Sequence, residues 1–380
     1  MKKALIVLLL LAFVAGGLFA QFSLSGRVDT GLAIFKAAGN DDVQFGLISK
    51  QLGANGIRGE INFNVTNEAG NAGLSFRLRS NGDSSNFVDN LNFRWAYGWI
   101  KAFDGLLEVR GGRIQGSDFD TLDNVSDGAT LFDSYGLMAY VTPVDMFKIG
   151  VGAYSGTALG STHSYLDEDK TPPEWVHETP IEETATGWAG FGIYVPDVLD
   201  FVAQMDFGKN NVNAWVSVGV TAIPSLDLIL TAGLDNLTEF SDAGTIGFYE
   251  QLGFNGIENL GLGLSLGQSI NQAPDSDLSF AADLWVNYAM GSVTPRLDLA
   301  FGLGAGFVPT SFYFAEFFQP AYAKDMKFMA FIPSVQLQVA SNCFVDLGFF
   351  GGIDIGDIPA FGGADTGFSF GAFLDLYVRF

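Results

Sequence analysis

The sequence predicts an all-β fold: a single transmembrane antiparallel β-barrel, an up-and-down meander of about 16 to 18 strands. Segments with apolar residues at every second position recur along the chain, and tight turns alternate with long loops between them. The final segment also presents one continuous apolar face. In a bilayer such strands must close into a barrel, because every backbone N–H and C=O group needs a partner inside the protein.

The final segment of the chain alternates strictly. Apolar residues stand at every second position from Phe368 to Phe380, and Phe373, Asp375, Tyr377 and Arg379 fall between them. Side chains alternate faces along a strand, so one face is continuously apolar and the other carries two charges and a phenol. A soluble sheet rarely has so apolar an edge strand, because such an edge invites aggregation. The pattern favours a strand that faces lipid and pairs with the first strand.

This ending resembles the closing strand of bacterial outer-membrane β-barrels, which ends in Phe after apolar residues at every second position. The matching residues are Leu374, Leu376, Val378 and Phe380. The resemblance implies that these residues are the assembly signal for the barrel-assembly machinery, and that the protein lies among the lipids of the bacterial outer membrane. From these residues alone, an ordinary amphipathic strand remains an alternative.

The beginning of the chain has the pattern of a secretory signal peptide. Lys2 and Lys3 precede an apolar run from Ala4 to Ala15, and the small residue Ala20 ends the segment. The apolar run is too short for a stable transmembrane helix. We expect residues 1–20 to be cleaved, which removes two lysines and changes the formal net charge from −23 to −25.

Residues 21–380 are expected to form the barrel. No later segment resembles the roughly 20-residue apolar run of a spanning helix, whereas 48 glycines and 36 phenylalanines suit membrane strands. The strong acidity argues against nucleic acid partners. Long extracellular loops are expected at about residues 36–55, 114–135, 156–186 and 306–327.

Each predicted strand rests on its own alternation. In the first, Phe22, Leu24 and Val28 face away from Ser23 and Arg27. The strands are expected at residues 22–34, 57–65, 74–79, 91–99, 106–113, 136–142, 147–155, 188–195, 201–207, 212–222, 226–235, 245–252, 259–267, 278–290, 296–305, 328–339, 343–350 and 366–380. The count of 18 is even, as in bacterial outer-membrane barrels, and one miscounted hairpin would give 16. Either size encloses a water-filled channel.

The strand at 91–99 has aromatic side chains on one face and Arg94 on the other. The aromatic positions are Phe93, Trp95, Tyr97 and Trp99. They resemble the girdle of aromatic residues at a membrane interface, so we expect this face to point outward.

Charged residues at the polar positions of the strands should line the channel. The predicted basic wall consists of Arg27, Arg58, Arg77, Arg79, Arg94, Arg110 and Arg113, of which Arg113 lies at a strand end. The later strands supply the predicted lumen acids Asp206, Asp227, Asp283, Asp298, Asp346 and Asp375. The loop after the fifth strand adds Asp118, Asp120, Asp123, Asp127 and Asp133.

This arrangement is similar to general porins, in which the loop between strands five and six folds into the barrel opposite wall arginines. The resemblance implies a channel for ions and small hydrophilic solutes, and a homotrimer. Residues 114–135 take the place of that loop. Opposed charged walls orient polar solutes and disfavour apolar ones. Alternatively, the arginines only neutralise lumen carboxylates and stiffen the wall.

The sequence offers little for catalysis. Both histidines, His163 and His177, lie in the predicted loop 156–186, so no wall histidine can activate a serine. We predict no enzyme activity, no catalytic residue, no cofactor and no metal site. One alternative is a barrel that acts as an adhesin or surface-recognition protein through its acidic loops. Another, a carrier of long apolar ligands, is disfavoured by the polar inward positions.

Overall fold

The computed structural model describes residues 20–48, 57–82, 91–115, 119, 133–159, 163–167, 174–178, 181–208, 212–235, 237–239, 244–271, 278–303, 327–356 and 365–380. The expected signal peptide up to residue 19 and parts of all four expected long loops lie outside these residues.

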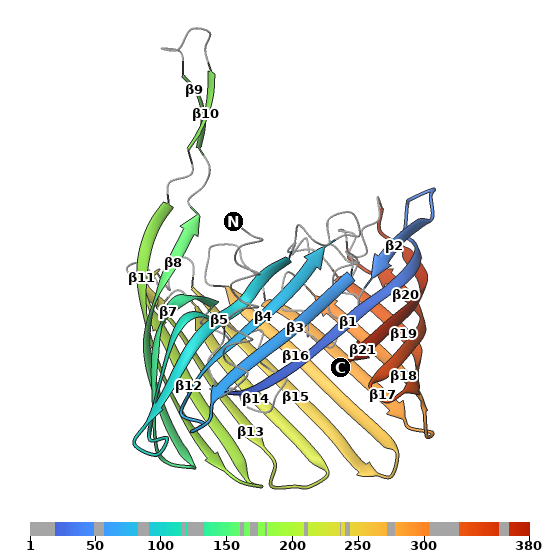
Figure 1. The fold of residues 1–380 in the computed structure, drawn as a ribbon. Coiled ribbons are helices and arrows are strands. Elements are labelled where there is room, and N and C mark those ends of the chain that lie inside the picture. The colour runs from blue at the N-terminus through green and yellow to red at the C-terminus, as the bar shows by residue number, and fades with distance from the viewer. Residues whose placement is uncertain are drawn as a thin grey trace.

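Eighteen strands of the described chain close into one barrel, in which each strand is antiparallel to both neighbours (Figure 1). This confirms the predicted meander and fixes its strand number. The strands of the barrel are β1 (Ala20–Lys36), β3 (Ile57–Asn67), β4 (Ala72–Gly82), β5 (Leu91–Ala102), β6 (Leu107–Gln115), β7 (Asp133–Val144), β8 (Phe147–Leu159), β11 (Ile181–Val195), β12 (Leu199–Phe207), β13 (Val212–Val220), β14 (Leu226–Asp235), β15 (Thr245–Ile257), β16 (Leu260–Asn271), β17 (Leu278–Tyr288), β18 (Val293–Leu303), β19 (Lys327–Ala340), β20 (Cys343–Asp354) and β21 (Phe368–Arg379).

The first and last strands form the seam of the barrel. β1 pairs with β21 from Arg27 opposite Arg379 to Lys36 opposite Phe370. Gly26 and Phe380 complete the seam with two backbone hydrogen bonds of 2.9 and 3.0 Å. A Cβ atom at Gly26 would lie 2.5 Å from the Phe380 ring, so this close approach requires glycine.

Three strands within the loops were not predicted. β2 (Gln44–Ile48) pairs with β1 from Gly31 to Phe35, on the same edge that pairs with β3 from Ala20 to Asp29. β9 (His163–Asp167) and β10 (Glu174–Glu178) form a separate hairpin that extends above the rim between β8 and β11 (Figure 1). A short 3-10 helix, η1 (Leu237–Glu239), follows β14. Each new strand has five residues, too few for a clear alternation.

Tight turns connect the strands at one end of the barrel, the lower end in Figure 1. In the turn between β3 and β4, the Asn67 side chain accepts hydrogen bonds from the N–H groups of Asn71 and Ala72, and Gly70 has a φ of 70°. A positive φ of this kind favours glycine. The other described turns lie at residues 103–106, 145–146, 196–198, 221–225, 258–259, 289–292 and 341–342.

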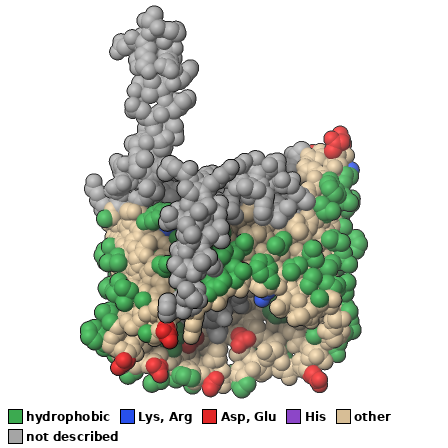
Figure 2. Space-filling model, in the orientation of Figure 1, with side chains coloured by type: hydrophobic (Ala, Val, Ile, Leu, Met, Phe, Trp, Pro, Cys, Tyr) green, Lys and Arg blue, Asp and Glu red, His purple; other side chains and the backbone are tan. Residues whose placement is uncertain are grey.

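The two faces of the wall differ in polarity. On β1, Leu24, Val28 and Leu32 point outward and are exposed, whereas Asp29 is buried on the inner face. Figure 2 shows apolar side chains spread over the outer surface and acidic side chains along the lower rim. None of the described residues forms a helix that is long and apolar enough to cross a membrane.

The expected outward face of the aromatic strand β5 is wrong for three of its residues. Phe93 does point outward, where its ring meets Phe76. A β-bulge then shifts the register between β4 and β5: Leu78 pairs with Phe93, but Arg77 pairs with Trp95. The extra residue reverses the alternation. Trp95, Tyr97 and Trp99 therefore line the inner face, where Trp95 lies under the Arg77 guanidinium.

The register of the seam predicts a specific cross-link. In a Cys343→Ser background, Val28→Cys and Val378→Cys should form a disulfide on oxidation, because directly paired Cα atoms lie about 4.5–5.5 Å apart. The disulfide joins the two ends of the barrel, so a mobility change on a denaturing gel, reversed by reductant, reports it. Val28→Cys with Leu374→Cys is the control, displaced by about 13 Å along the strand. Equal cross-linking of both pairs would contradict this register.

Candidate functional site

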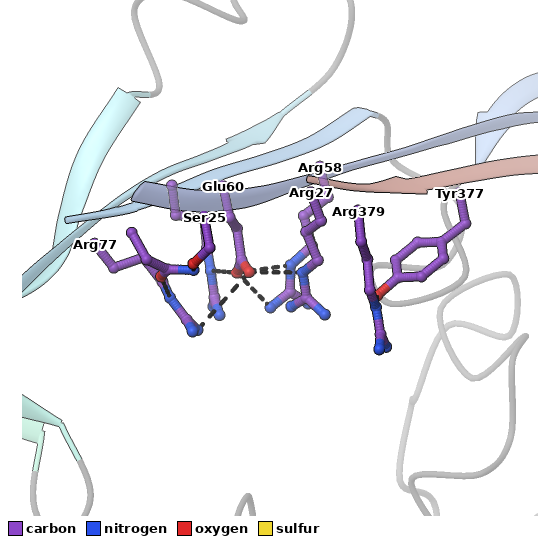
Figure 3. A network of polar contacts seen from close by, with 9 residues as sticks. Ser25, Arg27, Arg58, Glu60, Arg77, Tyr377 and Arg379 are labelled. Atoms are coloured by element: carbon purple, nitrogen blue, oxygen red, sulfur yellow. Dashed lines mark hydrogen bonds and ion pairs between the residues drawn. The ribbon is translucent and has the colours of Figure 1, made fainter. Parts of the chain in front are cut away.

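Four arginines surround one carboxylate on the inner face of β1, β3 and β4 (Figure 3). Glu60 is 2% exposed, and its oxygens lie 2.6 Å from Arg27 Nε, 2.7 Å from an Arg58 terminal nitrogen and 2.5 Å from Arg79 Nε. Arg77 lies farther away, at 3.8 Å. Charge-assisted hydrogen bonds of this length are strong. We call these five residues the arginine cluster.

Strand register explains why the cluster forms. Glu60 on β3 stands directly opposite Arg27 on β1 and directly opposite Arg79 on β4. Arg58 is two residues away on β3 and therefore shares the inner face with Glu60. Arg77, two residues from Arg79, reaches Glu60 diagonally across the β3–β4 pair.

Neighbouring groups hold Arg77 in place. Its Nε donates a hydrogen bond to Asn62 Oδ1 at 2.5 Å, and the Asn62 amide in turn donates to Ser25 Oγ at 3.3 Å. The Arg77 guanidinium carbon lies 3.7 Å from the centre of the Trp95 ring. A cation–π contact of this kind contributes about 0.5–2 kcal/mol. The guanidinium is therefore fixed from two sides.

The end of the chain extends the basic surface. Arg379 on β21 stands opposite Arg27 across the seam, and its Nε donates a hydrogen bond to the Tyr377 hydroxyl (Figure 3). No role was predicted from the sequence for Arg379 or Glu60. The polar alternation of their strands was the available signal, but only the pairing of β21 with β1 and of β3 with its neighbours brings these residues together.

The other three predicted arginines lie in different places. Arg94 is the extra residue of the β5 bulge, close enough to Arg77 and Arg79 for their charges to repel. Arg110 pairs with Glu108 at 2.5 Å on the inner face of β6, above the Tyr140 ring.

Arg113 departs from the predicted inward position. It stands opposite Tyr135 on β7, and Tyr135 is exposed on the outer face like Leu137 two residues later. Arg113 and Arg110 are three residues apart on β6, and an odd spacing puts two side chains on opposite faces of a strand. Arg113 is therefore on the outer face.

The predicted lumen acids share the inner face of the later strands. Asp206 accepts hydrogen bonds from the Tyr154 hydroxyl at 3.1 Å and from the Asn213 N–H at 3.2 Å. Asp298 forms an ion pair of 2.5 Å with Arg296. Asp346 and Asp375 stand directly opposite each other in the β20–β21 pair. Asp283 is buried, and Asp227, at the lower end of β14, is exposed.

The predicted loop acids cannot be placed in the same way. Asp118, Asp120, Asp123 and Asp127 lie outside the described residues. Asp133 is the first residue of β7, opposite Gln115, and its side chain is outside the described part. Asp29 and Glu108 were not predicted, although both lie on the inner face.

One residue of the loop after β6 is packed against the inner wall. Phe119 is 2% exposed, and its ring centre lies 5.9 Å from that of Tyr140 on β7 and 5.5 Å from that of Trp188 on β11. Its carbonyl oxygen accepts a hydrogen bond of 2.8 Å from the Gln204 amide on β12. The buried cluster also includes Ile114, Met138 and Val202.

Phe119, which we call the aromatic anchor, packs on a part of the inner face that is apolar. This apolar part was not predicted from the sequence. The predicted polar alternation does not hold at Met138, Tyr140 and Trp188, which occupy inward positions. Glycines at 150 and 190 leave room for the rings, since a Cβ atom at Gly150 would lie 2.6 Å from Trp188. Lys148 lies above the Tyr140 ring, 4.5 Å from its centre.

Removing the aromatic anchor should release this point of the loop. Phe119→Ala deletes a fully packed ring, a change that typically costs about 3–5 kcal/mol in a core. In single-channel recordings, we expect the variant to show more open-channel current noise than the parent protein. Phe103→Ala, in an exposed turn at the lower rim, is the matched control. Equal noise in all three proteins would show that Phe119 does not hold the loop.

The barrel is similar to solved structures of outer-membrane porins. OccK11 (OpdR) of Pseudomonas aeruginosa matches with a TM-score of 0.54 at 9% identity, covering 95% of each chain. OccAB3 of Acinetobacter baumannii matches with a TM-score of 0.52 at 9% identity, covering 94% of this chain and all of that one. OprD of P. aeruginosa matches with a TM-score of 0.50 at 9% identity, covering 94% of this chain and 95% of that one.

No protein-family model matches the sequence, and no curated protein is similar to it in sequence. The likeness is therefore one of architecture, and it extends over nearly the whole chain. The chain has the fold of the bacterial outer-membrane porins.

Proposed function

We propose that this protein is an outer-membrane porin, a channel for the passive diffusion of ions and small hydrophilic solutes. The observation that carries the proposal is the closed 18-strand barrel with ionised groups along its inner face. A barrel of this size encloses an aqueous lumen. Charged side chains at inward positions suit water and polar solutes, and are unfavourable for a purely structural interior.

The charges divide the wall into two sectors. The basic sector runs from β1 to β6 and carries the arginine cluster, Arg94 and Arg110. An acidic sector covers β17 to β21 with Asp283, Asp298, Asp346 and Asp375. The two sectors adjoin at the β1–β21 seam, and side chains of opposite sign there create a field along this part of the wall that orients dipolar solutes and disfavours apolar ones.

The aromatic anchor supports a lumen narrowed by its own loop. Phe119 is held against β7, β11 and β12, close to the basic sector on β6. In this proposal, the loop from 114 to 135 turns into the lumen and carries its acids toward the wall arginines. Pore width at this level then limits the size of the solute.

The remaining parts of the proposal concern targeting and assembly. Residues 1–20 act as a cleaved signal peptide, and Leu374, Leu376, Val378 and Phe380 form the signal for the barrel-assembly machinery. The three outward residues of this signal on β21 lie along the lipid-facing side of the seam. A homotrimer fits the general-porin resemblance. Diffusion requires no cofactor and no catalytic residue, and the structural neighbours are channels rather than enzymes.

Single-channel conductance tests the proposal directly. The mature protein, refolded from detergent into a planar bilayer, should give stable ohmic steps, because an open aqueous lumen conducts without gating. A salt gradient adds a reversal potential whose sign shows which charges dominate. Folding is checked by the altered gel mobility of the unheated barrel. Silence from a folded barrel would contradict a channel and favour surface recognition, for which the protruding β9–β10 hairpin is the supporting observation.

Charge at the arginine cluster should set ion selectivity. Arg77→Ala with Arg79→Ala removes two positive charges from the inner face, so we expect the reversal potential to shift toward cation selectivity. The control is Arg113→Ala, which removes one positive charge from the outer face; its shift is compared with half of that of the double variant. An equal shift in the control, or no shift in the double variant, would exclude Arg77 and Arg79 from the selective part of the lumen.

A further inference from the structure

Glu60 differs from Glu108 and Asp298, two other inward acids, in its ion-pair partners. It contacts four arginines, whereas Glu108 pairs with Arg110 and Lys101, and Asp298 pairs with Arg296. The five residues of the arginine cluster carry a formal charge of +3, four positive charges and one negative. Asp29, buried on β1 directly opposite Arg58, supplies a second carboxylate beside the cluster, and the two carboxylates together neutralise only part of the charge of the four arginines.

The Glu60 carboxylate stands where the guanidinium donors of the cluster converge. Guanidinium groups recognise carboxylates and phosphates by pairs of N–H donors, and Arg58 already gives Glu60 Oε1 two such contacts, at 3.0 and 2.7 Å. Arg27 and Arg79 approach Glu60 from the two neighbouring strands. Their donors converge on one small volume, which is the geometry of a binding site for a compact oxyanion.

A vacant site of this kind would be a trap inside a channel. Conduction requires that a solute bind well enough to enter and weakly enough to leave. Four converging guanidinium groups without a counter-anion would hold phosphate or a carboxylate strongly, and a long residence would block the lumen. Glu60 is covalently tethered and 2% exposed, so it remains at the site whatever passes.

We propose that Glu60 is a specificity-determining residue: a tethered counter-anion that keeps the arginine cluster from retaining compact oxyanions while leaving its net positive charge. The inference rests on the proposed porin function. A purely structural counterion would hold the arginine side chains in place but would leave the response to added anions unchanged after its charge is removed.

The test compares phosphate block in the parent protein and in Glu60→Gln. Inorganic phosphate is added at constant ionic strength to single channels in a planar bilayer. Glu60→Gln keeps the shape of the side chain and removes its charge, so phosphate should block it at concentrations about tenfold lower or more, with longer blocked intervals. Phosphate responses that match the parent protein would overturn the proposal.

A matched control changes the same charge elsewhere. Glu68→Gln lies in the exposed turn between β3 and β4, close in the chain but away from the cluster. It should respond to phosphate as the parent protein does. A comparable increase in block in Glu68→Gln would mean that net charge alone sets the response, and would also overturn the proposal.

A second variant and a binding measurement cover the cases in which Glu60→Gln does not fold or the parent protein does not conduct. If Glu60→Gln does not fold, Glu60→Asp withdraws the carboxylate by one methylene and should show an intermediate sensitivity to phosphate, while a response equal to that of the parent protein would count against the proposal. If the parent protein folds but does not conduct, the porin function fails by itself. Calorimetric titration of the detergent-solubilised barrel with phosphate then still tests Glu60, since the Gln variant should bind about tenfold more tightly than the parent.

Discussion

The barrel depends on the pairing of backbone groups across the β1–β21 seam. An open strand edge in hydrocarbon would leave a row of N–H and C=O groups without partners, at a cost of several kcal/mol for each group. β1 avoids this on both edges: it pairs with β21 on one side, and with β3 and then β2 on the other. Gly26 permits the last contact, because the Phe380 ring covers its Cα position.

Closure of the seam also determines which charged side chains of the inner face become neighbours. It places Arg379 beside Arg27, and Asp375 and Asp346 on the strands that follow around the wall. The basic and acidic sectors therefore meet at the β1–β21 seam, where Asp375 and Arg379 belong to the same strand. This juxtaposition of charges follows from one rule, that alternate residues of every strand share a face, applied to strands from both ends of the chain.

The strand order could be predicted from the sequence, because the strands of such a barrel must alternate apolar and polar side chains. The predicted bounds of most strands agree with the structure to within a few residues, and the predicted meander with its even strand number is confirmed. The failures have specific physical causes. β2, β9 and β10 are too short to show a period, and a single bulge residue in β5 reversed the faces of Trp95, Tyr97 and Trp99. The wrong inward prediction for Arg113 could have been avoided from the sequence, since Arg110 and Arg113 are three residues apart and therefore point to opposite faces of β6.

By itself, the sequence determined which residues alternate, and hence the barrel, the polar part of its inner face and the inward position of most wall arginines. Only the tertiary structure decided which of these side chains meet. Glu60 gains Arg27 and Arg79 as partners through the register of three strands, and Phe119 finds Tyr140, Trp188 and Gln204 on three others. Alternation is a local property of the chain, whereas register and loop packing depend on contacts between distant segments.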